Sequence, residues 1–365
     1  MKTYPKKPFS LAKSLFSALF LILFIGSFAP AFSQEEVAHD TTKVEIGNEE
    51  HTETFNVSDV IIEHVMDNHV WHFFNGHYGT LFLPVIVYTK ERGLDVFSSK
   101  NFYNEHHQLV SYNGYKLKYN KIHLGETAVI DFSITKNVAM LFINAALLLL
   151  VFTSVARSFK KNEGKAPKGL QSFIEPVILF VKDQVVKPNI GPKYEKFLPY
   201  LLTLFFFILF GNLLGLLPGA ANLSGNIAVT LVLALLTFII TNVNGNKEYW
   251  SHILWTPGVP LWLRPIILLV EIIGIFTKPF SLTIRLFAAI TAGHIVLLSL
   301  LALTFIFKSG FVGVGSSIFV LFISLIELLV AGIQAYVFTL FSALYIGMAV
   351  ADHSHGHEHE HESLM

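Results

Sequence analysis

The sequence contains a charged stretch inside apolar residues, Lys278-Pro-Phe-Ser-Leu-Thr-Ile-Arg285-Leu-Phe-Ala-Ala-Ile-Thr-Ala-Gly293-His294. This stretch limits the ways in which the chain can fold. It lies within an apolar run from Pro265 to Phe307. A helix through that run, at about 1.5 Å per residue, would be roughly 65 Å long, about twice the hydrocarbon thickness of a bilayer. A second run, Ser316 to Ala351, is also longer than one perpendicular span requires. Each run therefore predicts either a helical pair or one strongly tilted helix.

The composition of the whole chain indicates a membrane protein. Only 14% of its 365 residues are charged and 53% are hydrophobic, whereas soluble domains carry about 25% charged residues. The absence of Cys excludes disulfides, thiolate metal sites and Cys nucleophiles. The 26 basic and 26 acidic residues balance and are interspersed, which gives no basis for nucleic-acid binding.

The N-terminal third is predicted to lie outside the bilayer. Residues 1–33 read as a secretory signal, with basic residues before the apolar stretch Leu15–Phe28 and a cleavage site at Ala31-Phe32-Ser33. An uncleaved anchor helix is the alternative. Residues 34–135 are polar, and alternating patches at Leu81–Thr89 and Tyr112–Tyr119 predict short strands in a small mixed α/β domain.

The remaining chain is predicted to cross the membrane repeatedly. The first span, residues 136–156, precedes a cluster of basic residues that the positive-inside rule places in the cytoplasm. The cytoplasmic loop 157–196 contains an amphipathic pattern from Gln171 to Val186, which we expect to form a surface helix ended by Lys187-Pro188. The rest of the chain is predicted to form a channel domain, 197–351, and a His-rich cytoplasmic tail, 352–365. The predicted fold is thus an all-α integral membrane protein with about five to six membrane helices.

Spans at Phe197–Leu217 and Ile227–Val243 precede the two long runs. The charges inside those runs are the candidate functional groups. Each costs from about 2.5 to more than 10 kcal/mol at the bilayer centre, so such residues face protein or water and are functional by default. Glu271, Lys278 and Arg285 are spaced seven apart and share one helix stripe if the helix continues through Lys278-Pro279. His294, nine residues past Arg285, is expected to face a different environment, and the second run carries Glu327 with Gln334 seven residues on and Tyr345 eighteen on.

A permanent cation beside titratable groups is the arrangement expected of a proton path. Arg cannot lose its proton at accessible pH, whereas His and Glu can titrate in the working range. The alternative is that these residues form buried ion pairs that hold two helices together, although such pairs rarely add net stability. Lys278 could instead extend its amine towards an interface.

The stretch from Lys278 to His294 resembles the signature of subunit a of the F-type ATP synthase. Asn212-Leu-Leu-Gly-Leu-Leu-Pro218 and Gln334-Ala-Tyr-Val-Phe resemble the same family, and the resemblance covers roughly Leu198 to Val350. It implies that the long runs form a tilted helical hairpin against the ring of c subunits. Departures occur at three positions, where members often carry other residues: Gly215, Ala288 and Ala289.

The resemblance also implies roles for individual residues. Arg285 falls on the essential arginine that faces the c-ring, and Gln334 on the glutamine beside it. Glu271 falls on the acidic position near the cytoplasmic half-channel, and Asn212 on a polar position of the outer one. His294 and Glu327 fall on the pair lining the outer half-channel, with histidine and acid reversed relative to well-known members.

The partners that the resemblance implies are the c-ring, the b subunits of the peripheral stalk, membrane lipid and, indirectly, the F1 sector. The expected location is a bacterial inner membrane, with the N-terminal domain outside and the C-terminus in the cytoplasm. No cofactor is expected, and no phosphate-binding loop motif occurs in the sequence. The chain is thus predicted to be a non-catalytic subunit.

Two other functions are weighed against this one. The tail residues His353, His355, His357, His359 and His361 alternate with acids and could bind Zn²⁺ or Ni²⁺, which would suit a divalent-metal transporter. Arg285 would repel a cation in such a path, and a solvated tail with incidental metal affinity explains the pattern. An intramembrane hydrolase is disfavoured because no Gly-x-Ser-x-Gly or His-Glu-x-x-His motif occurs.

Overall fold

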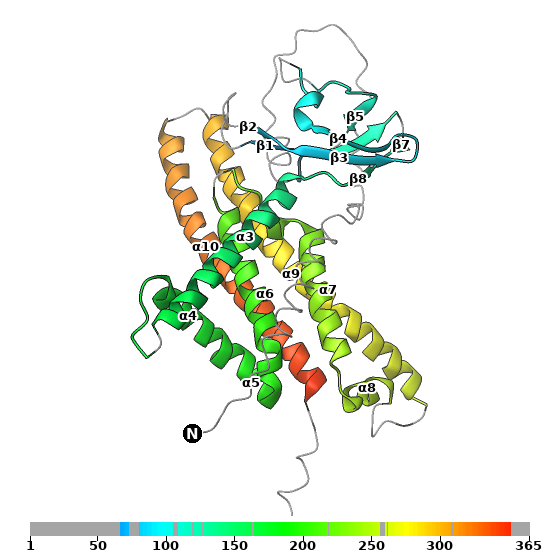
Figure 1. Cartoon of the computed structure of the whole chain (residues 1–365), viewed down its shortest axis with the longest axis vertical. Helices are drawn as coiled ribbons and strands as arrows, with labels where there is room; N and C mark the ends of the chain where they lie inside the picture. The colour runs from blue at the N-terminus through cyan, green and yellow to red at the C-terminus, as the bar shows by residue number, and fades with distance from the viewer. Residues whose placement is uncertain are drawn as a thin grey trace, which may run out of the picture.

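A computed structural model of the chain describes residues 66–72, 80–104, 109–118, 120–125, 127–162, 164–217, 219–255, 260, 262–307 and 310–351. The predicted signal segment, residues 34–65 and the His-rich tail 352–365 lie outside these described residues. Short strands gather at one end of the molecule and long helices make up the rest (Figure 1). This arrangement confirms the predicted all-α membrane fold with a small N-terminal domain.

The N-terminal domain consists of three small antiparallel sheets. Strand β1 (Val70–His72) pairs with β2 (Thr80–Phe82), and β3 (Pro84–Thr89) lies between β4 (Gly93–Ser98) and β8 (Ile130–Asp131). The third sheet has the order β5 (Tyr115–Lys118), β6 (Lys121–Leu124) and β7 (Thr127–Ala128). Both predicted strand regions are confirmed, while the helical content of the described residues of this domain is one 3₁₀ turn, η1 (Ser99–Phe102).

Alternating apolar residues give this domain a core of its own. Burial alternates along β3, as expected for a strand with one face on a core. Its inward residues pack with side chains from η1, β5 and β6, namely Val85, Val87, Phe102, Tyr115 and Ile122. The Tyr115 hydroxyl donates to Asp95, and burial together with that carboxylate raises the pKa of Tyr115. The strands are thus a folded unit on the N-terminal side of the first long helix.

Asp67 fastens the strand domain to the first membrane helix, α3 (Lys136–Lys161). Its carboxylate accepts hydrogen bonds from the Asn137 backbone N–H at 3.1 Å and from the Thr135 hydroxyl at 2.8 Å. Thr135 in turn caps α3 by accepting from Val138 N–H. Burial raises the pKa of Asp67, although these hydrogen bonds oppose the shift. The domain is therefore hydrogen-bonded directly to the start of α3.

The helical part begins with α3, which contains the predicted span 136–156. The remaining helices, in chain order, are α4 (Leu170–Phe180), the π-helical turn η2 (Val181–Val186), α5 (Lys187–Ile190), η3 (Gly191–Lys193), α6 (Tyr194–Gly215), η4 (Leu223–Gly225), α7 (Ile227–Val243), α8 (Lys247–Leu254), α9 (Arg264–Phe307) and α10 (Gly310–Val350). Four stretches of the described chain are long and apolar enough to span a membrane, and a fifth is counted if α7 and α8, bent by 101°, form one span.

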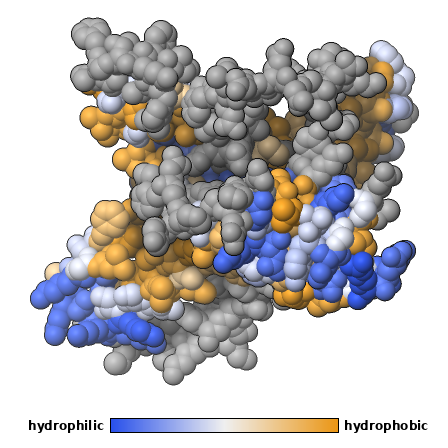
Figure 2. Space-filling model, turned by 90° about the horizontal axis from the view of Figure 1, so that it is seen from above, coloured by the Kyte–Doolittle hydropathy of each residue, from blue (hydrophilic) through white to orange (hydrophobic). Residues whose placement is uncertain are grey.

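The two long apolar runs are single helices rather than helical pairs. Helix α9 has 44 residues and continues through Pro279, and α10 has 41 residues. At 1.5 Å per residue α9 is about 66 Å long. The two helices pack against each other, and α10 also contacts α5, α6 and α7. Many of their outward side chains are exposed and apolar. Seen from above, hydrophobic patches lie beside hydrophilic ones on the surface of the described residues (Figure 2).

The predicted amphipathic helix forms, but it ends later than expected. Ile174, Val181 and Val185 of its apolar face are buried, and η2 packs on α6 and α10. Lys187-Pro188 does not end the helix, because Pro188 occupies the first turn of α5, where a missing N–H costs nothing. The chain turns instead at Gly191, whose φ of 73° favours glycine.

Gly347 allows α10 to approach α5 closely. A Cβ built on Gly347 would collide with the backbone carbonyl oxygen of Asn189. We expect Gly347→Ala to lower the free energy of unfolding by about 1–3 kcal/mol, since a backbone carbonyl cannot move aside as a flexible side chain can. Thermal unfolding of the purified chain in detergent measures this loss.

The control is Gly332→Ala on the same helix, where an added Cβ meets nothing within 4 Å. Ala is the better helix former, so this variant should melt at the same temperature or slightly higher. Equal melting temperatures for Gly347→Ala and the unsubstituted chain would contradict the close packing of α10 on α5.

Candidate functional site

The polar residues inside the membrane part meet along the seam between α9 and α10. Three contacts join the helices: the Lys278 Nζ lies 5.6 Å from the Tyr345 ring centre, the Arg285 Cζ lies 4.1 Å from the Phe341 ring centre, and the His294 Nδ1 lies 3.8 Å from the Glu327 Oε1. From one contact to the next, the residue numbers rise along α9 (278, 285, 294) and fall along α10 (345, 341, 327). The two helices are therefore antiparallel, and their contacts form a ladder of polar and aromatic groups.

Glu327 is the most deeply buried titratable group of this seam. Its side chain is 3% exposed, that of His294 is 15% exposed, and the distance of 3.8 Å between them is that of an ion pair rather than a hydrogen bond. Among the described residues, neither carboxylate oxygen of Glu327 has a hydrogen-bond partner. Buried polar atoms in that state are rare and each calls for an explanation. One explanation that suits the chemistry of both groups is that the Glu327 carboxylate exchanges a proton with the His294 imidazole or with water.

Arg285 places a permanent positive charge in the seam. In the part of the chain that the structure describes, no carboxylate lies within 4.0 Å of its guanidinium. The group is half-buried and lies over the face of Phe341, where the ring quadrupole attracts a cation. Gln334 lies seven residues from both Glu327 and Phe341, so it occupies the same side of α10 at a level between them. The guanidinium is thus available to an anion that approaches the seam.

Asn212 on α6 connects the seam to the link between α6 and α7. It is 2% exposed, and its amide donates to the Ala331 carbonyl oxygen of α10 at 3.2 Å. Its side-chain oxygen accepts the hydroxyl of Ser224, a buried residue of η4. Ala331 follows Glu327 by one helical turn. Asn212 therefore holds the backbone of α10 next to the buried carboxylate.

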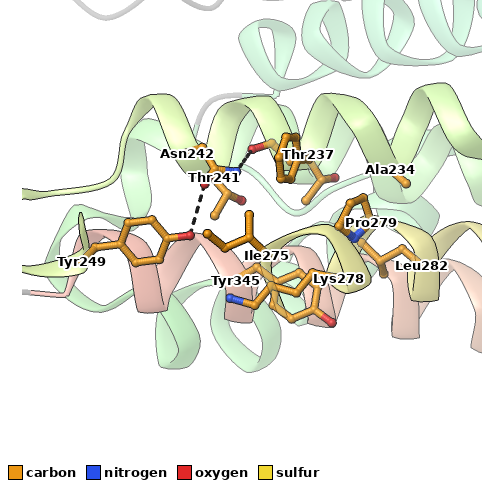
Figure 3. Close-up of a pocket in the computed structure, with 11 residues that line it drawn as sticks. Ala234, Thr237, Thr241, Asn242, Tyr249, Ile275, Lys278, Pro279, Leu282 and Tyr345 are labelled. Atoms are coloured by element: carbon orange, nitrogen blue, oxygen red, sulfur yellow. Dashed lines mark hydrogen bonds between the residues drawn. The ribbon is translucent and has the colours of Figure 1, made fainter. Parts of the chain in front are cut away.

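The opposite end of the seam contains a pocket between α7, α8, α9 and α10 (Figure 3). Polar side chains that line it include Asn242, Tyr249 and Lys278, and the Tyr249 hydroxyl donates to Asn242 at 3.2 Å. Glu271 is half-buried and lies two turns before Lys278 on α9. This end is separated from the His294–Glu327 pair by the part of α9 that carries Arg285.

Comparison with known proteins identifies the family to which this chain belongs. The family described as "ATP synthase A chain" matches residues 138–347, which is more than half of the chain. The chain belongs to this family. Its resemblance to subunit a of the F-type ATP synthase is therefore confirmed, and membership makes it a multi-pass membrane protein of the proton-translocating F0 sector.

Curated relatives agree with the family match. ATP synthase subunit a of Pelodictyon phaeoclathratiforme is 39% identical over 353 residues, which cover 92% of this chain and 91% of that protein. ATP synthase subunit a 2 of Chlorobaculum tepidum is 50% identical over 242 residues, 64% of this chain and 68% of the relative. ATP synthase subunit a of Anaeromyxobacter sp. is 38% identical over 329 residues, 88% of this chain and 76% of the relative.

A second family match covers the strand domain. Residues 60–138 match a domain of unknown function, DUF8433, which ends where the ATP synthase A chain match begins. The joint between the two matches coincides with the start of α3 at Lys136. The chain thus combines the membrane unit of its family with a separately recognised N-terminal unit.

The structure brings together some of the predicted site residues and not others. His294 meets Glu327, and Asn212 reaches the same region through Ala331. Glu271 lies apart from them, two helical turns before Lys278 on α9. His294 and Arg285 contact different groups, Glu327 and Phe341, and both of these groups lie on α10. Long side chains on either flank of a helix seam can both contact the partner helix.

Three residues of the site were not predicted from the sequence: Ser224, Phe341 and Tyr249. Phe341 could have been found from its spacing, since it follows Gln334 by seven residues on the same stripe. Ser224 gave no such signal, because the link that contains it has no regular period.

Among the described residues no group of three or more His, Cys, Asp or Glu side chains could hold a metal ion, and the His-rich tail lies outside them.

Proposed function

We propose that this chain supplies two proton half-channels to the c-ring of an F-type ATP synthase, so that proton flow turns the ring and drives ATP synthesis. The observation that carries this proposal is the buried Glu327 carboxylate, which has no hydrogen bond among the described residues and lies 3.8 Å from His294. The same seam holds the permanent charge of Arg285, which lies over Phe341. Titratable groups beside a permanent cation suit proton transfer between two aqueous sides.

The outer half-channel runs past Asn212, His294 and Glu327. A proton entering from outside passes to the Glu327–His294 pair and from there to a carboxylate of the c-ring. The neutralised carboxylate can then turn into lipid, since a protonated acid is far cheaper to place in hydrocarbon than its anion.

The inner half-channel lies near Glu271. After nearly a full turn of the ring, the c-subunit carboxylate releases its proton there to the cytoplasm and passes Arg285 as an anion, with Gln334 beside it. Arg285 attracts that anion and repels protons, which prevents a direct leak between the half-channels. Each proton that crosses supplies about 2.3 kcal/mol per 100 mV of membrane potential.

The orientation follows from charge. Basic residues cluster after the first span, at Arg157, Lys160, Lys161, Lys165 and Lys168, which favours the cytoplasm for that end of α3 and the outside for the strand domain. The C-terminal tail is then cytoplasmic. In this orientation the chain sits in a bacterial inner membrane, after removal of residues 1–33, and acts as a non-catalytic stator against the c-ring with the b subunits of the peripheral stalk and, indirectly, F1.

Replacing the permanent cation tests the central step. Arg285→Ala should reduce proton-driven ATP synthesis, in inverted membrane vesicles carrying the assembled enzyme, to the level of vesicles that lack this subunit. The reason is that nothing then attracts the c-ring carboxylate away from its proton. Immunoblotting of the membranes checks that the variant is present.

The matched control is Arg264→Gln at the start of the same helix, where the guanidinium lies over Trp255 instead of in the seam. This variant should retain ATP synthesis. Normal synthesis by Arg285→Ala would defeat the proposal.

Exchanging the two residues of the buried pair tests the outer path. His294→Glu places two carboxylates at close range, and Glu327→His removes the acid, so each single substitution should slow ATP synthesis by about tenfold or more. The double variant restores one imidazole and one carboxylate across the same gap and should be faster than either single variant. A double variant no faster than the slower single one would remove this pair from the proton path.

A further inference from the structure

Trp71 joins the strand domain to the membrane part at a point far from α3 in sequence. It lies on β1, is 5% exposed, and its indole N–H donates to the Gly219 carbonyl oxygen at 2.6 Å. Trp71 also packs in the same hydrophobic core as the membrane helices, together with Leu83. An indole N–H is a donor only, and burying it without an acceptor would be costly. The contact therefore fixes the strand domain to the link between α6 and α7.

That link is a packed turn rather than a loose connection. Gly219 has a φ of 77°, which favours glycine there. Ala221 and Leu223 are each 2% exposed, and the Asn222 side chain accepts the Gly225 N–H at 3.1 Å. The turn η4 contacts α3, α6 and α9. A displacement of the link at Gly219 would therefore move Ser224 as well.

From Ser224 the contacts continue to the buried carboxylate. The Ser224 hydroxyl donates to Asn212, and the Asn212 amide donates to the Ala331 carbonyl oxygen at 3.2 Å. Ser224, Asn212 and Ala331 are all buried. One turn before Ala331, Glu327 faces His294. A chain of short, buried contacts thus runs from the strand domain to the proton-exchanging pair.

We propose that Trp71 is a positioning residue for the outer proton path. By holding the link at Gly219, it sets Ser224 and Asn212 against α10 and so fixes Glu327 opposite His294. The inference rests on the proposed outer half-channel and assigns the N-terminal domain a task in it. The strand domain is then part of the proton-entry machinery and not merely an appendage to the membrane part.

The test uses the whole ATP synthase reconstituted in liposomes with F1 outside, so that the lumen pH is the pH at the outer path. ATP synthesis is measured over a range of lumen pH, and a potassium diffusion potential keeps the total driving force constant. Trp71→Phe keeps an aromatic ring and removes the N–H. We expect it to slow synthesis about fivefold, as for the loss of one ordinary hydrogen bond, and to shift the midpoint of the lumen-pH profile. A role in folding alone would lower the amount of enzyme without moving that midpoint.

Ser224→Ala, which breaks the same chain of contacts between the link and Asn212, should shift the midpoint in the same direction. If both residues act through Asn212, the double variant should show no more than the larger single effect, whereas independent sites would add. Trp262→Phe is the matched control, because this Trp is 74% exposed and should leave the profile unchanged.

Unchanged lumen-pH profiles for both Trp71→Phe and Ser224→Ala, or additive effects in the double variant, would overturn the inference. These outcomes differ from a failure of the proposed function. In that case Arg285→Ala would still synthesise ATP, whatever the behaviour of Trp71.

Discussion

An ionised side chain in the interior of a bilayer must face protein or water, and the structure of this chain is organised around that constraint. Arg285, His294 and Glu327 are placed where α9 and α10 face each other, and many exposed side chains of the same helices are apolar. The cost of a charge in hydrocarbon, at least several kcal/mol, exceeds what any single contact of the seam contributes. These residues are therefore confined to positions that face protein or water.

The lengths of α9 and α10 follow from the same requirement. The seam has to accommodate Lys278 at one end and His294 with Glu327 at the other, with Arg285 between them. A helix that crossed the membrane perpendicularly would offer about 20 residues for this purpose. Helices of 44 and 41 residues provide more positions along one seam and so separate two titratable regions by a fixed cation.

The elements around the seam act as supports. Gly347 lets α10 lie directly on α5, while Asn212 of α6 holds the backbone of α10 beside Glu327. The strand domain is attached to these supports at two places, through Asp67 at the start of α3 and through Trp71 at Gly219. Two attachment points restrict rotation of a small domain far more than one flexible tether would.

The membrane class, the first span, the strand regions and the stripe that contains Lys278 and Arg285 could all be predicted from the amino-acid sequence. All of these depend on local composition and on periods of two, three to four or seven residues, which can be counted along one chain. The family resemblance could also be found from the sequence, because the motif around Arg285 is contiguous. The end of the amphipathic helix was misjudged at Lys187-Pro188, because a proline can begin a helical turn as well as end one.

The contacts between separate elements could not be predicted in this way and are known from the folded chain. His294 and Glu327 lie on different helices, and their contact depends on the register of α9 against α10. The same is true of the contact between Trp71 and Gly219 and of the hydrogen bonds that link Ser224, Asn212 and Ala331. Such pairings depend on how side chains of separate elements fill the space between them, and no periodicity in one segment records the position of another.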